Sequence, residues 1–337
     1  MHFIKVPHTY AELVKKILLS HGAIDHTHAV EKDETHVYFP LATPKDAQDL
    51  QYPTIQREGR PLTPQTDLKG ALAKKLTAQE LELVKTAYDL VGDIAIIEIE
   101  KELQSKAKII GETLLGLFPN INVVLQRGKH EGTFRTQNLL HLAGENRKET
   151  LHKENGVLIK LNVEEVYFSA RLSTERKRIA GLVEPGEHIL VCFSGCAPYP
   201  CVLAKHTRAE TILGIEINPT GHAYGLENIK LNALKNVTLL NGDIRDLLPT
   251  MEESYDRVLM PLPKDAEQFL DVTLPHVLQN GTLHIYQFWQ EKDIDQNTQA
   301  LIAHINTLGY TAELLQTTLC GQHAPGTYRI CLDLRIT

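Results

Sequence analysis

The chain has 337 residues, enough for two or three domains, and its composition (42% apolar, 23% charged, 6% aromatic) is typical of a soluble globular protein. It has no apolar run near the roughly 18 residues that a membrane-spanning helix needs, and its first residues lack the apolar core of a signal peptide, so we expect a cytoplasmic protein without a membrane partner. The net charge of −7 argues against indiscriminate binding of nucleic acids.

The first 70 residues are predicted to form a small α/β domain and a linker. Apolar residues recur at helical spacing over Tyr10–Ser20, and Thr35–Pro40 is typical of a short strand. These elements place the expected domain at residues 1–55. Residues 56–70 are polar and contain prolines and glycines, so we interpret them as a linker.

Residues 71–165 are predicted to form a middle α+β domain. Amphipathic segments and alternating segments follow one another along this part of the chain. The expected elements are helices at Ala71–Leu76, Gln79–Leu83 and Leu103–Leu117, strands at Asp93–Ile99, Ile121–Leu125 and Gly156–Val163, and a strand at Glu165–Phe168 that leads into the next domain.

Residues 166–337 are predicted to form a third domain of alternating strands and helices. Such alternation implies an α/β fold, a doubly wound sheet with helices on both faces. Beyond the segment 189–217, the expected elements are helices at Thr174–Leu182, Tyr224–Leu234, Ala266–Val277 and 295–309, and strands at Val237–Leu240, Tyr255–Met260, Gly281–Phe288 and 325–335.

The segment 189–217 predicts a binding site for a cofactor that contains adenosine. An apolar strand, Ile189–Phe193, ends at a turn of small residues, and a helix and a second strand follow. The second strand ends on Glu216, about 20 residues after the turn, which is the spacing of a nucleotide-binding βαβ unit. The small residues let the backbone approach the ligand, and the acid can accept from both ribose hydroxyls.

Other candidate residues follow the ends of neighbouring predicted strands. We expect Asp243 to accept from the adenine amino group and Ile244 to pack on the ring. Because this unit has one acid and no phosphate-binding GxGxxG, it favours S-adenosylmethionine over NAD. The alternative is that these residues have only structural roles. The candidate cofactor-binding residues are Phe193, Ser194, Gly195, Ala197, Pro198, Glu216, Ile217, Asn218, Asp243, Ile244, Pro261 and Leu262.

The cysteines do not suggest a metal site. There are five, an odd number, and no CxxC pair occurs. We interpret them as buried small apolar residues and expect neither a metal nor a disulfide framework.

The charge is unevenly distributed. Residues 121–180 hold eleven Lys/Arg and seven Asp/Glu, a local charge of +4 in a protein of −7. Such a basic segment suits a selective partner that carries phosphates. A solvated charged surface is an equal alternative on charge alone.

Four sequence blocks together resemble one family. They are FRTQNLLHLAGENRKETLHKENG, VYFSARLSTERKRIA, EINP and RVLMPLPKDAEQFL. Their combination is similar to the archaeal and eukaryotic tRNA guanosine-37 N1-methyltransferases over nearly the whole chain, including the N-terminal VP…LVKK…YFP stretch. The resemblance implies a Rossmann-like class I methyltransferase domain that uses S-adenosylmethionine and releases S-adenosylhomocysteine.

The chemistry of that family requires a base and a cation. Guanine N1 carries a proton near neutral pH, so a base must remove it during methyl transfer, and the charge that develops toward O6 needs a donor or a cation. By resemblance, Glu175 is the base, Arg135 stabilises O6, Tyr167 organises the pocket and Pro263 belongs to the family's Asn-Leu-Pro motif. The simpler interpretations are an ion-pair partner for Glu175, a phosphate contact for Arg135 and a core residue for Tyr167.

Two departures from the family pattern concern the same pocket. The family's Asn-Leu-Pro is Pro261-Leu262-Pro263 in this chain, and proline offers no side-chain hydrogen bond. The acid and second glycine of the family's first motif are replaced by Val191 and Ala197. We expect the Ala197 methyl to narrow the approach to the methionine end of the cofactor.

By resemblance, the partner is a tRNA, bound through its anticodon loop and, by the N-terminal domain, through its outer corner. The target base must be unstacked to reach Glu175. We expect a monomer. The candidate phosphate contacts are Arg147, Lys148, Arg171, Arg176, Lys177 and Arg178.

Three functions therefore stay open. The first is N1-methylation of guanosine 37. The second is transfer of the aminocarboxypropyl group of the same cofactor to a tricyclic guanosine derivative, against which the presence of Glu175 and Arg135 argues. The third is tRNA binding by a relative whose cofactor site has decayed, which the changes at Val191, Ala197 and Pro261 would support.

Overall fold

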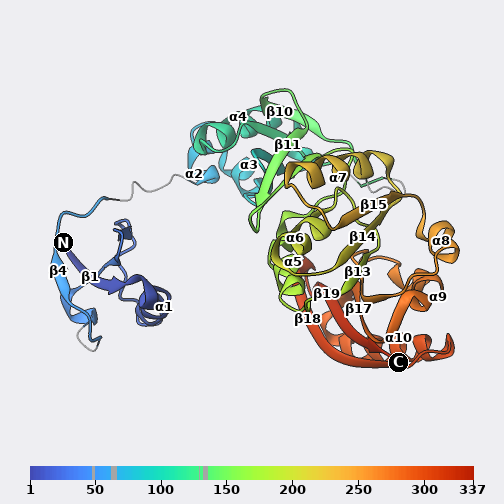
Figure 1. The fold of residues 1–337 in the computed structure, drawn as a ribbon. Helices are drawn as coiled ribbons and strands as arrows, with labels where there is room; N and C mark the ends of the chain where they lie inside the picture. The colour runs from blue at the N-terminus through green and yellow to red at the C-terminus, as the bar shows by residue number, and fades with distance from the viewer. Residues whose placement is uncertain (48–49, 62–66, 129, 132–135) are drawn as a thin grey trace. The chain divides into compact units, whose positions relative to one another are not determined.

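A computed structural model describes residues 1–47, 50–61, 67–128, 130–131 and 136–337 of the protein (Figure 1). The chain divides into two compact units, Met1–Ala71 and Leu72–Thr337. Within the described part of the chain, no helix has both the length and the apolar character to cross a membrane.

The first unit is a four-stranded antiparallel sheet with one longer helix. The strands are ordered β2–β3–β1–β4, and α1 packs Val14 and Leu18 against Ile4 and Phe39 of the sheet. The helix and the strand predicted here are confirmed, whereas β1 and β4 were not predicted. The elements are β1 (His2–Pro7), α1 (Ala11–Ser20), β2 (Glu31–Lys32), β3 (His36–Pro40) and β4 (Thr54–Gln56), with 3-10 turns at His8–Tyr10 and Pro44–Ala47.

The second unit begins with a small sheet and a hairpin. The sheet is ordered β10–β7–β6–β5 and carries α4 on one face, and β11 pairs with β12. The helix α2 (Leu68–Leu72) spans the division between the two units. The other elements are α3 (Ala78–Leu83), β5 (Tyr88–Val91), β6 (Ile94–Ile97), a 3-10 helix (Lys101–Lys106), α4 (Ala107–Leu117), β7 (Val123–Gln126), β8 (His130–Glu131), β9 (Thr136–Gln137), β10 (Leu140–Gly144), β11 (Glu149–Glu154) and β12 (Val157–Asn162).

The rest of this unit is a seven-stranded sheet ordered β15–β14–β13–β16–β17–β19–β18, in which β19 alone runs antiparallel to its two neighbours. The α/β, Rossmann-like fold predicted from the sequence is confirmed. The strands are β13 (His188–Val191), β14 (Thr211–Glu216), β15 (Val237–Asn241), β16 (Tyr255–Met260), β17 (Val277–Gln290), β18 (Ala312–Ala324) and β19 (Thr327–Ile336), and the helices are α5 (Ser173–Ala180), α6 (Pro198–His206), α7 (Pro219–Leu231), α8 (Ile244–Leu247), α9 (Leu270–Thr273) and α10 (Ile294–Thr307).

Helices cover both faces of this sheet (Figure 1). Ile189 and Val191 of β13 pack on one face with α5 and α6, while Leu190 packs on the other with α9 and α10. Central strands that are buried on both faces have continuous apolar sequences, which is why β13 could be predicted from the sequence. The same core cluster includes residues of β12 and of the small sheet, so the middle region and the large sheet share one core.

Two predicted elements were wrong, and a third, the helix predicted at Ala71–Leu76, already ends at Leu72. Glu165–Phe168 forms no strand, because the chain turns after β12 and the Val166 N–H bonds to the Asn162 carbonyl. The helix predicted at Ala266–Val277 is a series of short turns around α9, and Pro275 lacks the N–H that a continuous helix needs. The boundaries of the predicted domains and linker stay predictions.

Candidate functional site

A cavity of about 150 Å³ lies where β13, β14, β15 and β16 end. The strand order reverses between β13 and β16, and ligands of open α/β sheets bind at the carboxyl ends beside such a reversal. Most of the predicted cofactor residues meet here. The cavity is lined by Phe193, Gly195, Glu216, Ile217, Asn218, Asp243, Ile244, Pro261 and Leu262 from that set, and by Val166, Tyr167, Gly242, Arg245 and Phe269.

The turn between β13 and α6 is tightly wound. Phe193, Gly195 and Ala197 all have positive φ, at 55°, 57° and 64°. This conformation costs a residue with a side chain about 1–2 kcal/mol. The Phe193 ring meets the Phe269 ring at 5.0 Å in an edge-on contact, which helps to fix the strained turn.

Glu216 connects this turn to the next strand. Its carboxylate accepts the Gly195 N–H at 2.6 Å and the Asn218 N–H at 2.8 Å. Burial raises the pKa of the Glu216 carboxyl. A carboxylate has about four acceptor positions, so each oxygen can still accept a ribose hydroxyl. Glu216, which is predicted to accept hydrogen bonds from the ribose, is therefore held in position by two backbone hydrogen bonds before a ligand binds.

Asp243 lies at the start of α8. Its carboxylate accepts the Arg245 N–H at 2.9 Å and pairs with the Arg245 guanidinium at 2.6 Å, which lowers its pKa. The Arg245 guanidinium in turn lies 5.1 Å from the centre of the Phe269 ring. Arg245 and Phe269 were missed from the sequence, because nothing in their spacing relates them to the strand ends.

Three predicted cofactor residues do not line this cavity: Ser194, Ala197 and Pro198. Ala197 is fully buried, and a methyl built on Gly225 of α7 would lie 3.4 Å from the Ala197 Cβ. The Ala197 methyl thus lies close to α7, and its expected effect on the methionine end of the cofactor stays a prediction. Val191 is buried in the core of the sheet.

A second cavity, of about 520 Å³, adjoins the first and shares Val166 and Tyr167 with it. The Arg329 guanidinium donates to the Tyr167 hydroxyl at 2.8 Å and lies 5.0 Å from the centre of the Phe288 ring. Phe288 stacks on His323 with ring centres 4.0 Å apart. The larger cavity thus has a wall of aromatic rings and a guanidinium, surfaces on which a nucleobase stacks.

The predicted base, Glu175, is buried on α5. Its carboxylate accepts hydrogen bonds from the Nε and Nη2 atoms of Arg178, each at 2.7 Å, and from the Tyr286 hydroxyl at 2.8 Å. Cys320, which lines the larger cavity, lies beside it, and burial together with the Glu175 charge raises the pKa of the Cys320 thiol. Glu175 therefore lies one layer beneath the cavity wall.

The other predicted catalytic residues are placed differently. Tyr167 lines both cavities, whereas Pro263 is buried after Pro261 and Leu262. Arg135 lies outside the described residues.

Two predicted phosphate contacts were wrong. Arg176 is 2% exposed, and its guanidinium makes two hydrogen bonds of 2.5 Å to Glu154 of β11. The Arg178 guanidinium bridges the carboxylates of Glu175 and Asp333. The sequence of α5 contains several charged residues, but it does not indicate that Arg176 and Arg178 contact buried acids instead of solvent.

The remaining candidates lie nearer the surface. The side chains of Arg147 and Lys148 are each 31% exposed and pair with Asp93 and Glu164. Arg171 is more exposed, at 64%, and pairs with Asp89 at 2.6 Å. Lys177 is exposed on α5.

Three family models match the chain. Residues 150–310 match the TRM5/TYW2 methyltransferase domain, residues 68–147 match the TYW2 N-terminal domain, and residues 4–47 match the tRNA methyltransferase 5 N-terminal domain.

Two relatives match different shares of the chain. The chain is 34% identical to tRNA (guanine(37)-N(1))-methyltransferase Trm5b of Pyrococcus abyssi, over 99% of this chain and 98% of that protein. It is 29% identical to the tRNA(Phe) (4-demethylwyosine(37)-C(7)) aminocarboxypropyltransferase of Methanocaldococcus jannaschii, over 74% of this chain and 97% of that protein.

Solved structures agree with the fold. The crystal structure of Trm5b from Pyrococcus abyssi has a TM-score of 0.74 and 33% identity, and covers 100% of this chain and 99% of its own. A complex of aTrm5 with tRNALeu has a TM-score of 0.71 and 28% identity, with full coverage of both chains. M. jannaschii TYW2 in complex with AdoMet has a TM-score of 0.57 and 27% identity, and covers 74% of this chain and 99% of its own.

Proposed function

Because the chain belongs to the TRM5/TYW2 family of methyltransferases, we propose that it transfers a methyl group from S-adenosylmethionine to N1 of guanosine 37 of tRNA. The observation that carries this proposal is the pair of adjoining cavities that share Val166 and Tyr167. One suits an adenosine-containing cofactor, and the other is large enough for an unstacked nucleoside.

The smaller cavity fits the cofactor by its own chemistry. Glu216 offers acceptors for two ribose hydroxyls, Asp243 offers one for an adenine amino group, and Ile244 and Phe269 offer apolar surface for the ring. When bound there, S-adenosylmethionine supplies a methyl group on a sulfonium and leaves as S-adenosylhomocysteine.

Each predicted catalytic residue has a distinct role in this proposal. Glu175 takes the N1 proton as the N1–methyl bond forms, and Arg135 stabilises the charge at O6. Tyr167, on the wall common to both cavities, aligns the base with the methyl donor. Pro263 shapes the loop that follows β16.

The tRNA would contact the exposed cations of the second unit through its anticodon loop. Arg171 and Lys177 are the most accessible of the predicted phosphate contacts. The first unit, which resembles a separate N-terminal domain of the family, would contact the outer corner of the tRNA.

The experiment is incubation of the protein with S-adenosylmethionine and tRNA transcripts that carry G or A at position 37, followed by mass spectrometry of the nucleosides. We expect 1-methylguanosine from the G37 transcript alone, and its loss in Glu175→Gln and in Arg135→Gln. Glu313→Gln, an exposed acid on β18, is the matched control. Wild-type turnover by Glu175→Gln would remove the base from the mechanism.

Two further measurements separate the other two functions: the same incubation with tRNA that carries the tricyclic guanosine derivative at position 37, and calorimetry with S-adenosylmethionine. An aminocarboxypropyl adduct on a tricyclic base, with no 1-methylguanosine, would identify the second. Failure to bind S-adenosylmethionine in calorimetry would exclude both enzymes and leave tRNA binding.

A further inference from the structure

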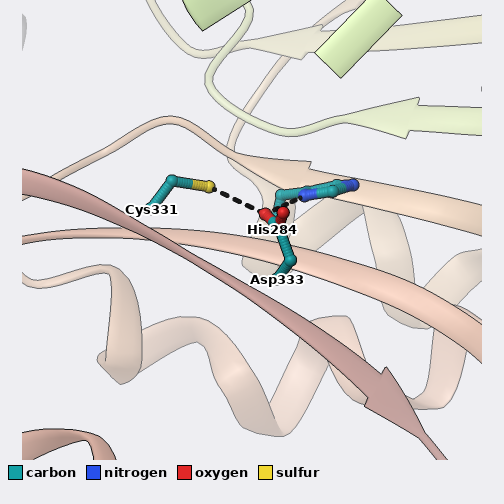
Figure 2. Close-up of side chains that lie close together, drawn as sticks. All are labelled: His284, Cys331 and Asp333. Carbon is teal, nitrogen blue, oxygen red and sulfur yellow. Dashed lines mark hydrogen bonds and ion pairs between the residues drawn. The ribbon is translucent and has the colours of Figure 1, made fainter. Parts of the chain in front are cut away.

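A row of buried and half-buried titratable side chains extends from Glu175 across the large sheet. Each member contacts the next at hydrogen-bond distance: Arg178 to Asp333 at 2.6 Å, His284 to Asp333 at 2.6 Å, Arg257 to His284 at 2.7 Å, and Arg257 to Glu187 at 2.7 Å. The centre of this row is drawn in Figure 2, where the Asp333 carboxylate lies between His284 and Cys331. The row, in order of contact, is Glu175, Arg178, Asp333, His284, Arg257 and Glu187.

The protonation of His284 follows from its two neighbours. A guanidinium can only donate, so the Nε2 atom of His284 must accept from Arg257. The Nδ1 atom therefore carries the hydrogen and donates it to Asp333. Burial also lowers the pKa of His284. The imidazole is neutral, in a single tautomer.

The same argument excludes a metal ion at His284, Cys331 and Asp333, whose ligand atoms lie within 4.8 Å of one another. Both imidazole nitrogens are engaged, and the Cys331 thiol donates to Asp333 at 3.3 Å. The guanidinium groups of Arg178 and Arg257 would repel a cation. The cluster serves the protein's own hydrogen bonds.

The row holds three carboxylates and two guanidinium groups around a neutral histidine, a net charge of −1. Arg178 lies between two of those carboxylates, with 2.7 Å contacts to Glu175 and a 2.6 Å contact to Asp333. If Asp333 were neutral, the whole charge of Arg178 would act on Glu175. A carboxylate that is paired with a guanidinium which has no other acidic partner is strongly stabilised in its ionised form, so it is a poor acceptor for a proton.

We propose that Asp333 and His284 are positioning residues for the reaction: Asp333, oriented by His284, takes part of the charge of Arg178, so that the Glu175 carboxylate can still accept the N1 proton. This inference rests on the proposed role of Glu175 as the base.

Apart from Glu175 itself, the hydroxyl and thiol groups that face it do not change their charge near neutral pH, so they do not complicate a pH profile of the rate. Burial raises the pKa of Tyr199, Tyr286, Cys320 and Cys331, so these hydroxyls and thiols are neutral near pH 7. The facing groups are Arg178 from α5, Tyr199 from α6, Tyr286 from β17, Cys320 from β18, and Cys331 and Asp333 from β19.

The test is the pH dependence of single-turnover methyl transfer by Asp333→Asn. We expect the rate near neutral pH to fall by about tenfold or more and the acidic limb of the profile to move to lower pH, with the Kd for S-adenosylmethionine unchanged. Arg335→Gln, two residues away in an exposed pair with Glu313, is the matched control and should match the wild type. A folded Asp333→Asn variant whose profile superimposes on the wild-type profile would overturn the proposal.

Two measurements keep the test decisive. If Asp333→Asn does not fold, His284→Gln replaces it, and we expect a smaller loss of rate in the same direction; no change would equally overturn the proposal. Nitrogen-15 NMR of the wild-type protein should show His284 with a hydrogen on Nδ1, and the opposite tautomer would break the row. The NMR spectrum does not depend on enzymatic activity. If the wild-type protein formed no 1-methylguanosine, the proposed function would be refuted, while the tautomer of His284 would still test the row of side chains.

Discussion

Glu216 shows how one side chain can prepare a site for its ligand. Its carboxylate fixes two backbone N–H groups on either side of the cavity, from the turn after β13 and from the start of α7. Because both are donors, the side chain between them must accept at both oxygens. The acid is therefore required by the protein's own turn as well as by a ribose.

The variant Glu216→Gln tests this requirement. The amide nitrogen cannot accept, so one backbone N–H loses its partner and the turn loosens. We expect the Kd for S-adenosylmethionine to rise by about tenfold to hundredfold, measured by calorimetry. Glu210→Gln, an exposed acid before β14, should bind normally. An unaltered Kd in Glu216→Gln would show that the site does not depend on this carboxylate.

Asp333 and His284 predict how stability depends on pH. Burial lowers the pKa of His284 below its ordinary 6.5, so the unfolded chain binds this proton first as the pH falls below 6.5, and stability decreases. Burial opposes ionisation of Asp333, but His284 and Arg178 outweigh it and hold its pKa well below 3.8, so a further loss follows below pH 3.8.

Urea unfolding between about pH 8 and pH 2 checks both parts of this prediction. The free energy of unfolding should decrease toward acid, and His284→Gln should flatten the upper part of the curve. A free energy that rises on acidification would contradict both assignments.

At the scale of elements, α5 is attached to the hairpin β11–β12 by a buried ion pair. Arg176 and Glu154 are each 2% exposed at their side chains, and the guanidinium also packs over the rings of Phe168 and Tyr199. Removal of one charge leaves the other buried without a partner, which is far more costly than loss of an exposed pair.

We therefore expect Glu154→Gln to lower the free energy of unfolding by about 3–5 kcal/mol, measured with urea. Glu313→Gln, in the exposed pair with Arg335, should cost less than about 1 kcal/mol. The double variant Glu154→Leu, Arg176→Met should recover much of the loss, because it removes both charges. A double variant as unstable as Glu154→Gln would assign the cost to packing instead.

The elements also show what the sequence could predict. The strand β13 is apolar because both of its faces are buried, so its position was clear. The edge strand β18 is largely exposed, and without a buried stripe it has no period to recognise. Apolar and polar residues alternate over Glu165–Phe168 as in a strand. However, the Asn218 side-chain amide donates a hydrogen bond to the Glu165 carbonyl, and the chain bends toward the cavity. Contacts far apart in the sequence decided those two cases.

The candidate site divides in the same way. Glu216 and Asp243 could be placed from the sequence, because the ends of parallel strands meet at one edge whatever the side chains do. Phe269 and Arg245 could not, because each reaches the cavity through packing between non-adjacent segments. Burial of Arg176 was equally invisible, since a basic helix looks the same whether its cations face water or buried acids.

At the scale of the whole molecule, the described residues that line the smaller cavity all belong to the second unit. A chain that begins at Asp67 retains α2 and this entire lining. We expect its Kd for S-adenosylmethionine to lie within about twofold of the full chain, and its affinity for an anticodon stem-loop to persist while affinity for full-length tRNA decreases. Equal affinity of both proteins for full-length tRNA would leave the first unit without a role in binding.

Exposed cations predict the salt dependence of tRNA binding. Of the described basic residues of 121–180, most are paired with acids and partly or fully buried, so few counterions should be released on binding, whereas Arg171 is 64% exposed despite its pair with Asp89. We expect Arg171→Gln and Lys177→Gln each to reduce the slope of log K against log salt by about one. Lys108→Gln, on an 80% exposed side chain of α4, should leave it unchanged. A slope insensitive to both substitutions would place the tRNA on another face.

The wall that Val166 and Tyr167 form between the two cavities has a consequence for inhibitor chemistry. Two ligands that touch the same pair of side chains lie close enough to be joined by a short tether. A bisubstrate compound, adenosine linked to guanine through a brief sulfur-free spacer, would bind its second half at high effective concentration once the first is seated. The compound would be selective because it occupies both cavities. An enzyme that has only the smaller, adenosine-binding cavity would bind just one end of the molecule.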